Sequence, residues 1–220
     1  MPVDVAELQS LKHLAVVPAA GLADLARASY AKRLSRGQLL FTAGEPSEHL
    51  YVIRSGRIKI MIDSDRGDTL LLTVLSAGDL IGELSMIDGL DRSTSAEALD
   101  ASTVLALPAA QIRQVLTDHP AALMAMAVEL ATSLRRVSDT AADLVLLDLP
   151  RRLAKLIVIR TTSGRAELGL TQSDLAAQLG VTRQALNRAL SGLVKRGWVT
   201  ADGTAVQVHD KAALARFSRG

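Results

Sequence analysis

Arginine and amide side chains are grouped in a predicted helix near the carboxyl end of the chain, over residues 183–196. Its first two turns carry Arg183, Gln184, Asn187 and Arg188. Arginine can donate two hydrogen bonds to guanine O6 and N7, and glutamine and asparagine can pair with adenine N6 and N7. Apolar residues such as Leu186 and Leu193 lie on the other face and would seat the helix on its own domain. The helix therefore has the side chains needed to read base edges in the major groove of double-stranded DNA.

A second short helix and a tight turn precede this one. Thr171, with Asp174 three residues later, resembles a capping box in front of a helix over residues 175–179, and Thr182 can cap the helix that follows. This order predicts a helix-turn-helix. A winged hairpin is expected next, with strands at residues 198–200 and 205–209 around the turn dipeptide Asp202-Gly203. The residues expected to meet DNA phosphates are Thr171, Gln172, Thr182, Lys195 and Arg196.

The formal net charge of +2 hides an uneven distribution of charge. Residues 150–220 hold 12 Lys or Arg against 4 Asp or Glu, whereas residues 1–149 hold 13 against 19. An acidic part is therefore joined to a basic part, and the basic part is the candidate for binding a polyanion. Only 2% of the residues are aromatic, which argues against binding single-stranded nucleic acid by base stacking. A basic winged domain that binds a protein is the alternative.

The acidic part has the pattern of a small β-roll. Residues 4–34 are predicted to be helical, and a short helix is expected at 109–117. Between them, glycines recur about every ten residues among β-rich segments, which is typical of an antiparallel sandwich or roll. The predicted strands are residues 39–42, 50–54, 57–62, 69–75, 95–99 and 103–107. A roll of this kind can enclose one small ligand.

A long helix is predicted from Pro120 to Leu149, because no Gly or Pro interrupts this run before Pro150. Its apolar residues form a narrow heptad stripe: Leu123, Ala127, Leu130, Leu134, Val137, Ala141 and Leu144. The stripe predicts a parallel two-stranded coiled coil and hence a homodimer, whereas a long core helix of a monomer is the alternative. Pro150 is expected to end the helix and to mark a domain boundary.

Over essentially its whole length, the chain resembles the cyclic AMP receptor protein and fumarate-nitrate regulator (CRP/FNR) family of transcription regulators. The resemblance implies an α+β fold with a cyclic-nucleotide-binding β-roll at 1–119, a dimerisation helix at 120–149 and a winged helix-turn-helix at 150–220. In the family, an Arg-Glu pair and a second Arg read the operator half-site, and the matching positions here hold Arg183, Gln184 and Arg188. Because an amide can both donate and accept, Gln184 predicts a changed preference at one base pair.

A second motif resembles the phosphate-binding cassette of the family. It consists of Ile81-Gly82-Glu83-Leu84-Ser85 followed by Asp91-Arg92-Ser93. Gly82 lets the backbone approach a ligand, a short helix starting there would direct N–H groups at an anion, and Glu83 can accept from a ribose hydroxyl. Arg92 supplies a bidentate cation and Ser93 a hydroxyl for the same phosphate. The alternative is a surface turn with a solvated arginine.

One pair of positions departs from the family pattern. A Thr-Ser pair on the long helix contacts the adenine in the family, and the matching residues here are Val137 and Ser138. Valine cannot hydrogen-bond a purine amino group, so discrimination between bases should weaken. Cyclic AMP is the expected effector, but cyclic GMP, another ligand or no ligand are alternatives. Val137 could also hold the dimer together without a ligand.

The expected protein is a homodimeric regulator that binds a palindromic operator and works with RNA polymerase. An enzyme or its regulatory subunit is the remote alternative, because the histidines are scattered without ligand spacing and no nucleophile lies near a base in sequence. Glu83, Asp88 and Asp91 could pair as acids or hold a metal, but a ribose contact and a polar turn suit them better, so no metal is expected.

The same totals bear on location. The absence of cysteine fits a reducing compartment. The start of the chain is acidic and lacks the apolar segment of a secretory signal, and no apolar run approaches the roughly 20 residues that span a bilayer. A cytoplasmic protein without a membrane segment is therefore expected.

Overall fold

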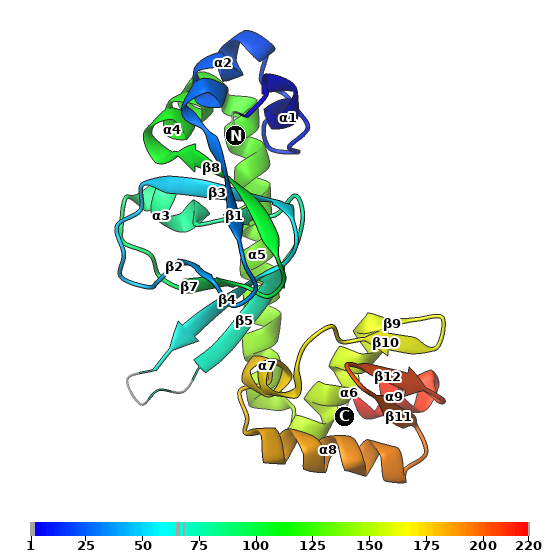
Figure 1. The fold of residues 1–220 in the computed structure, drawn as a ribbon. Coiled ribbons are helices and arrows are strands. Elements are labelled where there is room, and N and C mark those ends of the chain that lie inside the picture. Colours follow the sequence, from blue (N-terminus) through cyan, green and yellow to red (C-terminus); the bar gives the residue numbers. More distant parts are fainter. Residues whose placement is uncertain (1–2, 65–66, 68, 220) are drawn as a thin grey trace. The chain divides into compact units, whose positions relative to one another are not determined.

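The computed structural model describes residues 3–64, 67 and 69–219 (Figure 1). The chain divides into two compact units, Met1–Ser133 and Leu134–Gly220. Across the described residues, no helix is long and apolar enough to cross a membrane.

Helices and a β-roll make up the first unit. The chain begins with α1 (Val5–Gln9) and α2 (Ala19–Ala28). The strands are β1 (Tyr30–Leu34), β2 (Leu39–Phe41), β3 (His49–Ser55), β4 (Ile58–Asp63), β5 (Thr69–Leu75), β6 (Leu80–Ile81), β7 (Ser95–Ala98) and β8 (Ser102–Pro108). The helices that complete the unit are α3 (Glu83–Asp88), α4 (Ala109–Asp118) and the first half of α5 (Pro120–Leu146). The strands form two antiparallel sheets, ordered β1-β8-β3-β6 and β2-β7-β4-β5.

The sheet that contains β3 and β8 separates two apolar cores. Successive side chains on a strand point to opposite faces. On β8, Leu105 packs in the core formed with α2, α4 and α5, whereas Val104 packs in the interior of the roll. On β3, Val52 lies in the helical core and Tyr51 in the roll. The roll interior is therefore a second core, and the cassette motif lies at its edge.

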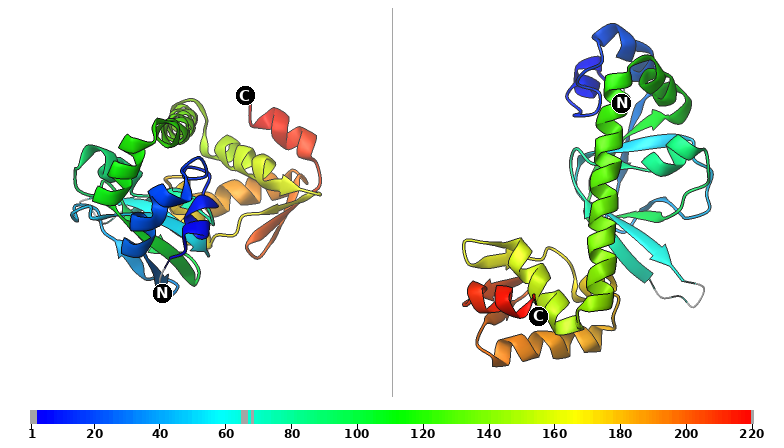
Figure 2. Two further views of the ribbon diagram at one scale, coloured as in Figure 1. Left: turned by 90° about the horizontal axis from the view of Figure 1, so that it is seen from above. Right: turned by 180° about the vertical axis from the view of Figure 1, so that it is seen from behind.

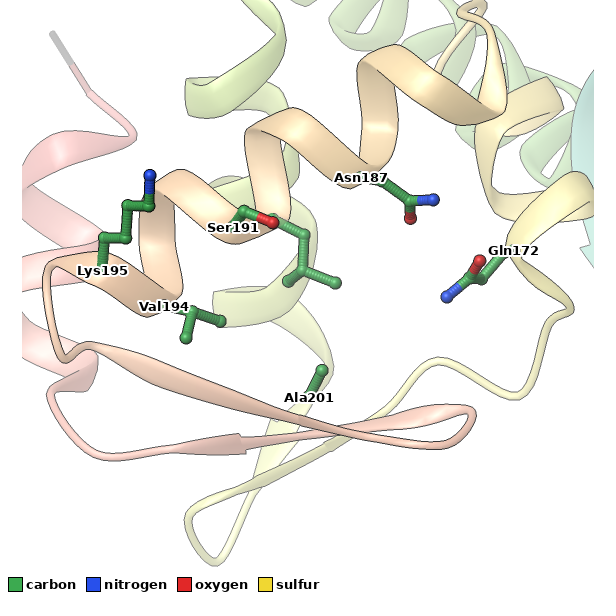
Figure 3. A pocket seen from close by; sticks show the side chains of 7 residues that line it. Gln172, Asn187, Ser191, Val194, Lys195 and Ala201 are labelled. Atoms are coloured by element: carbon green, nitrogen blue, oxygen red, sulfur yellow. The ribbon is translucent and has the colours of Figure 1, made fainter.

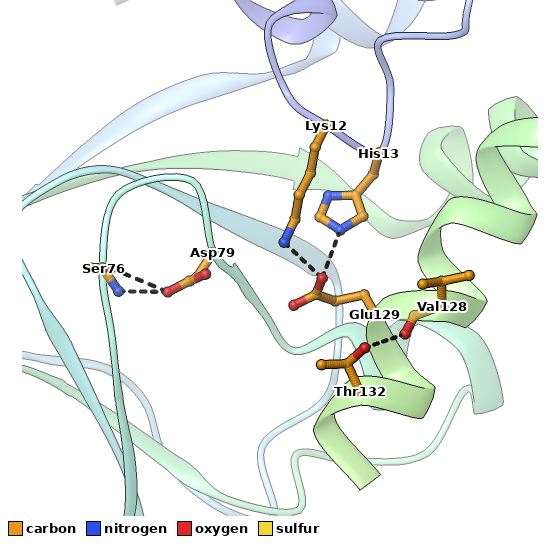
Figure 4. Close-up of polar contacts among 7 residues, drawn as sticks. All are labelled: Lys12, His13, Ser76, Asp79, Val128, Glu129 and Thr132. Carbon is orange, nitrogen blue, oxygen red and sulfur yellow. Dashed lines mark hydrogen bonds and ion pairs between the residues drawn. The ribbon is translucent and has the colours of Figure 1, made fainter. Parts of the chain in front are cut away.

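The amino-terminal segment is tied to α5 by polar contacts as well as by the core. Lys12 Nζ lies 2.7 Å from Glu129 Oε2, and the buried ring of His13 places Nε2 3.8 Å from the same oxygen (Figure 4). In the segment between β5 and β6, Asp79 accepts a hydrogen bond from the backbone N–H of Ser76. The first half of α5 is thus held by contacts within its own unit.

Around α6 (Leu149–Arg160), the second unit is built as a small winged domain (Figure 2). The other helices are α7 (Gln172–Gln178), α8 (Arg183–Lys195) and α9 (Lys211–Phe217). The strands β9 (Thr161–Thr162), β10 (Arg165–Glu167), β11 (Val199–Asp202) and β12 (Ala205–Val208) form one antiparallel sheet in the order β11-β12-β10-β9. Both α8 and α9 pack on α6, whose Leu153 and Ile157 are fully buried. The predicted α+β fold, with a helix-turn-helix and a wing, is confirmed.

The prediction that residues 4–34 are helical is wrong at its end. Residues 30–34 form the edge strand β1, which pairs with β8 from Tyr30 opposite Ala106 to Leu34 opposite Ser102. Ser29 is already extended, with φ −88° and ψ 153°. The helical spacing of apolar residues ends at Ala26, and pairing with a distant strand outweighs the local preference of the residues that follow.

The helix boundary near Pro150 also differs from the expectation. The long helix ends at Leu146, and Asp148 caps the next helix by accepting a hydrogen bond from Arg151 N at 3.0 Å. Pro150 lies in the first turn of α6, where a missing N–H costs nothing because it would have no partner within the helix. Pro150 therefore starts a helix instead of ending one.

Candidate nucleotide pocket and nucleic-acid interface

Arg92 is a charged residue held inside the first unit, with only 4% of its surface exposed. Its Nη1 donates to the carbonyl oxygen of Gly82 at 3.2 Å, and its Nη2 donates to the carbonyl oxygen of His49 at 2.5 Å. Its backbone pairs with the loop after β2, because Arg92 N donates to Glu45 O at 2.9 Å and Gly44 N donates to Arg92 O at 2.8 Å. The side chain is therefore fixed at both ends.

One side-chain nitrogen of Arg92, the buried Nε, is not matched by an acceptor among the described residues. A buried donor without an acceptor costs about 1–3 kcal/mol, and more when it carries charge. Burial lowers the pKa of Arg92, while Tyr51, Glu45 and Glu83 act in the opposite direction. An anion that brings an acceptor oxygen would satisfy Nε and stabilise the charged guanidinium.

Gly82 is required by the arginine itself. It has φ 83° and ψ 22°, the left-handed conformation that glycine adopts without strain. A Cβ at this position would lie 2.9 Å from Cζ of Arg92, which is too close. The sequence predicted a close approach at Gly82, and the group that approaches in this structure is the guanidinium of Arg92.

The helix α3 begins directly after Gly82 and is tied to the segment that carries Arg92. Ser85 Oγ donates to the carbonyl oxygen of Asp91 at 3.2 Å, and Ser85 is buried. Burial raises the pKa of Glu83, and hydrogen bonds from the backbone of Glu83 and Gly82 act in the opposite direction. Glu83 is thus a carboxyl group whose charged form gains when a hydroxyl donates to it.

The residues of the predicted pocket are divided between the two units. The first unit brings together Gly82, Glu83, Ser85 and Arg92, whereas the side chains of Leu84 and Ser93 are exposed. Val137 and Ser138 belong to the second unit and are both exposed on α5, where Ser138 Oγ donates to Leu134 O at 2.9 Å. In the described residues, no group of three or more His, Cys, Asp or Glu could hold a metal ion.

Two aromatic residues beside Arg92 were missed by the sequence analysis. Cζ of Arg92 lies 4.3 Å from the ring centroid of Phe41 and 5.5 Å from that of Tyr51. Their positions on β2 and β3 have no fixed spacing from residue 92. The scarcity of aromatic residues was the one available signal, since the chain has only two Phe and two Tyr.

The polar face of α8 is as predicted. Leu186 and Leu193 are buried on its other side. The predicted base-reading residues Arg183, Gln184, Asn187 and Arg188 are all exposed. Both helix caps are also confirmed, because Thr171 Oγ1 accepts from Asp174 N at 3.1 Å and Thr182 Oγ1 accepts from Ala185 N at 3.2 Å. The hydroxyl groups therefore fix the ends of α7 and α8.

A shallow hollow of about 410 Å³ lies between α8 and the wing (Figure 3). Its lining consists of Gln172, Asn187, Leu190, Ser191, Val194, Lys195 and Ala201. The amides of Gln172 and Asn187 face one another across it, and Gln172 Oε1 accepts from Arg183 Nε at 3.1 Å. Ser191 was missed by the sequence analysis, although it lies one helical turn from both Asn187 and Lys195.

Part of the basic surplus of the second unit is used inside the unit. Nη1 of Arg152 donates to Leu179 O at 2.8 Å, and Lys155 pairs with Asp143. Cζ of Arg196 lies 4.9 Å from the ring centroid of Trp198 and 4.7 Å from that of Phe217. Arg196, which was expected to contact phosphates, thus packs on aromatic rings in this structure, whereas Lys195 lines the hollow.

The heptad stripe of α5 lies on the surface of the chain. Leu134 is 66% exposed and Val137 64% exposed, and Leu123 and Leu144 are exposed as well. The helix buries a different face, through Ala122 and Met126, against the core of the first unit. Leucine and valine exposed along one stripe of a long helix are typical of a surface that packs on another helix.

Comparison with known proteins agrees with this arrangement. Residues 31–119 match the cyclic nucleotide-binding domain family, and residues 144–217 match the Crp-like helix-turn-helix domain family. The chain is 34% identical over 192 residues to the CRP-like cAMP-activated global transcriptional regulator of Mycobacterium tuberculosis, an alignment that covers 84% of this chain and 86% of that protein.

Two solved structures share the fold at low sequence identity. A variant of CooA from Carboxydothermus hydrogenoformans has a TM-score of 0.78 at 20% identity, and the match covers 99% of this chain and 97% of that one. The c-di-GMP responsive global regulator CLP of Xanthomonas campestris has a TM-score of 0.74 at 22% identity, covering 88% of this chain and 100% of that one.

A cyclic nucleotide-binding domain followed by a helix-turn-helix defines a DNA-binding transcription regulator and not an enzyme. The chain belongs to the CRP/FNR family of these regulators.

Proposed function

We propose that two copies of the chain form a homodimer that binds a palindromic operator in double-stranded DNA, and that cyclic AMP bound in the β-roll modulates this binding. The observation that carries the effector is the buried Nε of Arg92, which has no acceptor among the described residues. A cyclic phosphodiester carries one negative charge and supplies acceptor oxygens. The relative from Mycobacterium tuberculosis is a cAMP-activated regulator, and this similarity favours cyclic AMP as the effector.

The phosphate and the ribose supply most of the proposed affinity. Arg92 would make a charge-assisted hydrogen bond to the phosphate, and Glu83 would accept from the ribose 2′-hydroxyl. The hydrogen bond to the base that Val137 cannot make is worth only about 0.5–1.5 kcal/mol. Binding should therefore persist with roughly tenfold weaker affinity and with less discrimination between bases.

The exposed stripe of α5 supports the proposed dimer. Two such helices in parallel would bury Leu134 and Val137 against their copies, as the a and d positions of a coiled coil do. A two-fold dimer would present two α8 helices to successive major grooves, about 34 Å apart. A coupling free energy of about 1–3 kcal/mol between nucleotide and operator would be enough for a useful switch.

On the DNA, we assign base reading to Arg183, Gln184, Asn187 and Arg188. Arg183 and Arg188 would donate to guanine, and Gln184 would accept or donate where a carboxylate could only accept. Thr171, Gln172, Thr182 and Lys195 would contact the phosphate backbone through side chains at the helix ends and beside the hollow. We also propose RNA polymerase as a partner, on the basis of the family alone.

We propose domain limits at residues 1–119, 120–149 and 150–220, and a cytoplasmic location, where the DNA of a bacterial regulator lies. The matched families lie inside the first and overlap the last of these ranges, since they cover residues 31–119 and 144–217.

A second candidate keeps the architecture but changes the effector. Val137 favours it, because the position offers no hydrogen bond to an adenine. The fold itself accommodates another effector, since CLP, which shares it, is a c-di-GMP responsive regulator.

Calorimetric titration of the full-length chain with cyclic AMP, cyclic GMP and c-di-GMP separates these candidates. Cyclic AMP is expected to bind with one site per chain and to tighten or weaken binding to sequences that the protein selects from random DNA. Heat from c-di-GMP alone would favour the second candidate, and no heat from any of the three would mean that the effector is not one of these nucleotides.

A further inference from the structure

Three aromatic side chains, those of Phe41, Tyr51 and His49, are stacked beside the guanidinium of Arg92, and the proposed nucleotide contacts assign them no role. The ring of Phe41 lies under Cζ at 4.3 Å, and the ring of Tyr51 lies at 5.5 Å. The two rings stack on each other with centroids 5.9 Å apart and an angle of 25° between their planes. Tyr51 in turn stacks on His49, whose carbonyl oxygen accepts from Nη2. Phe41 comes from β2, whereas His49 and Tyr51 come from β3, a strand of the other sheet of the roll.

The aromatic faces and the edge donors of an arginine serve different purposes. A ring face attracts a cation through its quadrupole but accepts no hydrogen bond along the edge of the guanidinium. Phe41 can therefore hold the plane of the group without using an N–H. The carbonyl groups of Gly82 and His49 each accept from one Nη, and the side chain of Tyr51 also hydrogen-bonds to Arg92. Among the described residues, the buried Nε is a nitrogen of this guanidinium that finds no acceptor.

Burying the charge of Arg92 against these rings lowers the stability of the fold, which suggests that the arrangement serves binding. Phe41 and Tyr51 are 5% and 8% exposed, so a charged group is packed against two of the chain's few aromatic side chains inside an apolar core. A buried charge is expensive to desolvate. A guanidinium held over a ring loses little further freedom when it binds an anion, which lowers the entropic cost of binding.

We propose that Phe41 and Tyr51 are positioning residues for Arg92: their rings fix the plane of the guanidinium so that its Nε–H is directed at the phosphate of the bound nucleotide. This inference rests on the proposed cyclic nucleotide site. Phe41, which is closer, contributes more through its ring than Tyr51, whose side chain also hydrogen-bonds to Arg92.

The test is a double-mutant cycle in the full-length chain, read by calorimetric titration with cyclic AMP. Phe41→Leu should weaken cyclic AMP binding about tenfold, which corresponds to about 1.4 kcal/mol. In an Arg92→Lys background, where the cation has no plane to fix, the same change should have less than a twofold effect. Tyr51→Leu should weaken binding by about threefold, and Tyr51→Phe, which keeps the ring and loses only the hydroxyl contact with Arg92, should weaken it less.

A control separates positioning from damage to the core. Leu40 is the neighbour of Phe41 on β2 and is buried in the same core. Among the interactions described, its side chain makes no contact with the guanidinium of Arg92. Leu40→Ala should lower the thermal midpoint at least as much as Phe41→Leu and should leave the affinity for cyclic AMP within twofold. Equal losses of affinity in the two variants would overturn the proposal.

Nuclear magnetic resonance of the protein without nucleotide tests the position of the Arg92 guanidinium over the Phe41 ring directly. The buried Nε–H of Arg92 should give a slowly exchanging nitrogen-proton resonance, identified by its loss in Arg92→Lys. A ring beneath it should shift the proton upfield, and Phe41→Leu should remove that shift. If the parent protein binds cyclic AMP but Phe41→Leu changes neither affinity nor shift, the positioning role is wrong and the proposed function stands. If the parent protein binds no cyclic nucleotide, both fall.

Discussion

Arg92 and Gly82 are a matched pair, because one side chain fills the space that a Cβ on the other would need. A larger residue at position 82 would displace the guanidinium even if the left-handed backbone could be kept. The cation is compensated by carbonyl groups and ring faces but retains an unmatched donor. A buried charged side chain with an unmatched donor is typical of a binding site. An arginine without such a role would place its charge in water at the surface.

Replacing Arg92 by Ala should abolish any gain in operator affinity that cyclic AMP produces. Affinity for DNA without nucleotide should stay the same, because no residue of α8 is altered. The loss of stability should be no more than about 3 kcal/mol, the cost of leaving the His49 carbonyl group unpaired, because the Gly82 carbonyl keeps its hydrogen bond from Met86 N. Fluorescence anisotropy with labelled operator DNA measures both affinities, and Arg33→Ala, an exposed change on β1, is the control. A persisting nucleotide effect in Arg92→Ala would contradict the assignment of the pocket.

On α8, two cations should have separable effects. Arg188→Ala should lower operator affinity by about 1–3 kcal/mol while leaving affinity for random DNA nearly unchanged, because a bidentate contact to guanine is sequence-specific. Lys195→Ala should weaken both equally and reduce the slope of log K against log salt by about 0.9, as expected for one phosphate contact. Titrations on both DNAs at several salt concentrations distinguish the two. Equal losses on both DNAs for Arg188→Ala would mean that Arg188 reads no base.

At the scale of secondary structure, α5 has two faces with different tasks. Ala122 and Met126 are buried in the first unit, whereas the stripe through Leu134 and Val137 is exposed. A single chain gains nothing from apolar residues placed in water. The stripe is best explained by a second copy of the same helix.

Replacing Leu134 by Asp should convert the dimer to a monomer, because a carboxylate at a coiled-coil core position would be buried without a partner. Sedimentation velocity measures the change, and circular dichroism should show an unchanged fold because Leu134 is 66% exposed within the chain. The matched control is Arg135→Asp, which introduces the same side chain one residue off the stripe and should leave the dimer intact. A dimeric Leu134→Asp protein would place the interface elsewhere.

The element boundaries show which local signals were decisive. The capping residues Thr171 and Thr182 were predicted correctly because the hydrogen bonds that they make are local, although α7 begins at Gln172 and not at Leu175. Tyr30–Leu34 was predicted as helix and forms a strand, because its partner β8 lies some seventy residues further along the chain. Pro150 was expected to end a helix, yet Asp148 caps a new helix that accommodates the proline in its first turn.

At the scale of the whole molecule, the stability of the chain should depend on His13. Burial lowers the pKa of His13 below the value of about 6.5 that is usual for histidine, with Lys12 acting in the same direction and Glu129 and Asp79 in the opposite direction. Between the lowered pKa and 6.5, the unfolded chain binds more protons than the folded chain. The contribution of a neutral His13 is therefore complete above about pH 6.5 and is lost as the pH falls below it.

Urea unfolding of the parent protein and of His13→Gln from pH 5 to 8 measures this dependence. The difference between the two free energies of unfolding should change with pH below about 6.5 and be constant above it. Subtracting the variant removes the contribution of His49, whose pKa burial lowers as well, since that group is present in both proteins. A difference that is constant down to pH 5 would mean that His13 is not protonated on unfolding in this range.

The sequence by itself determined the order of the parts and the kind of chemistry in each. Helical and strand periodicity, glycine spacing and caps are local, so the roll, the helix-turn-helix and the exposed polar face of α8 could be predicted from it. The family motif identified Gly82 and Arg92 without their surroundings. Only the tertiary structure decided that Arg92 is buried on Phe41 and Tyr51, that Arg196 packs on rings and that residues 30–34 are a strand. Those outcomes depend on contacts between residues far apart in the chain, and no spacing within one segment encodes them.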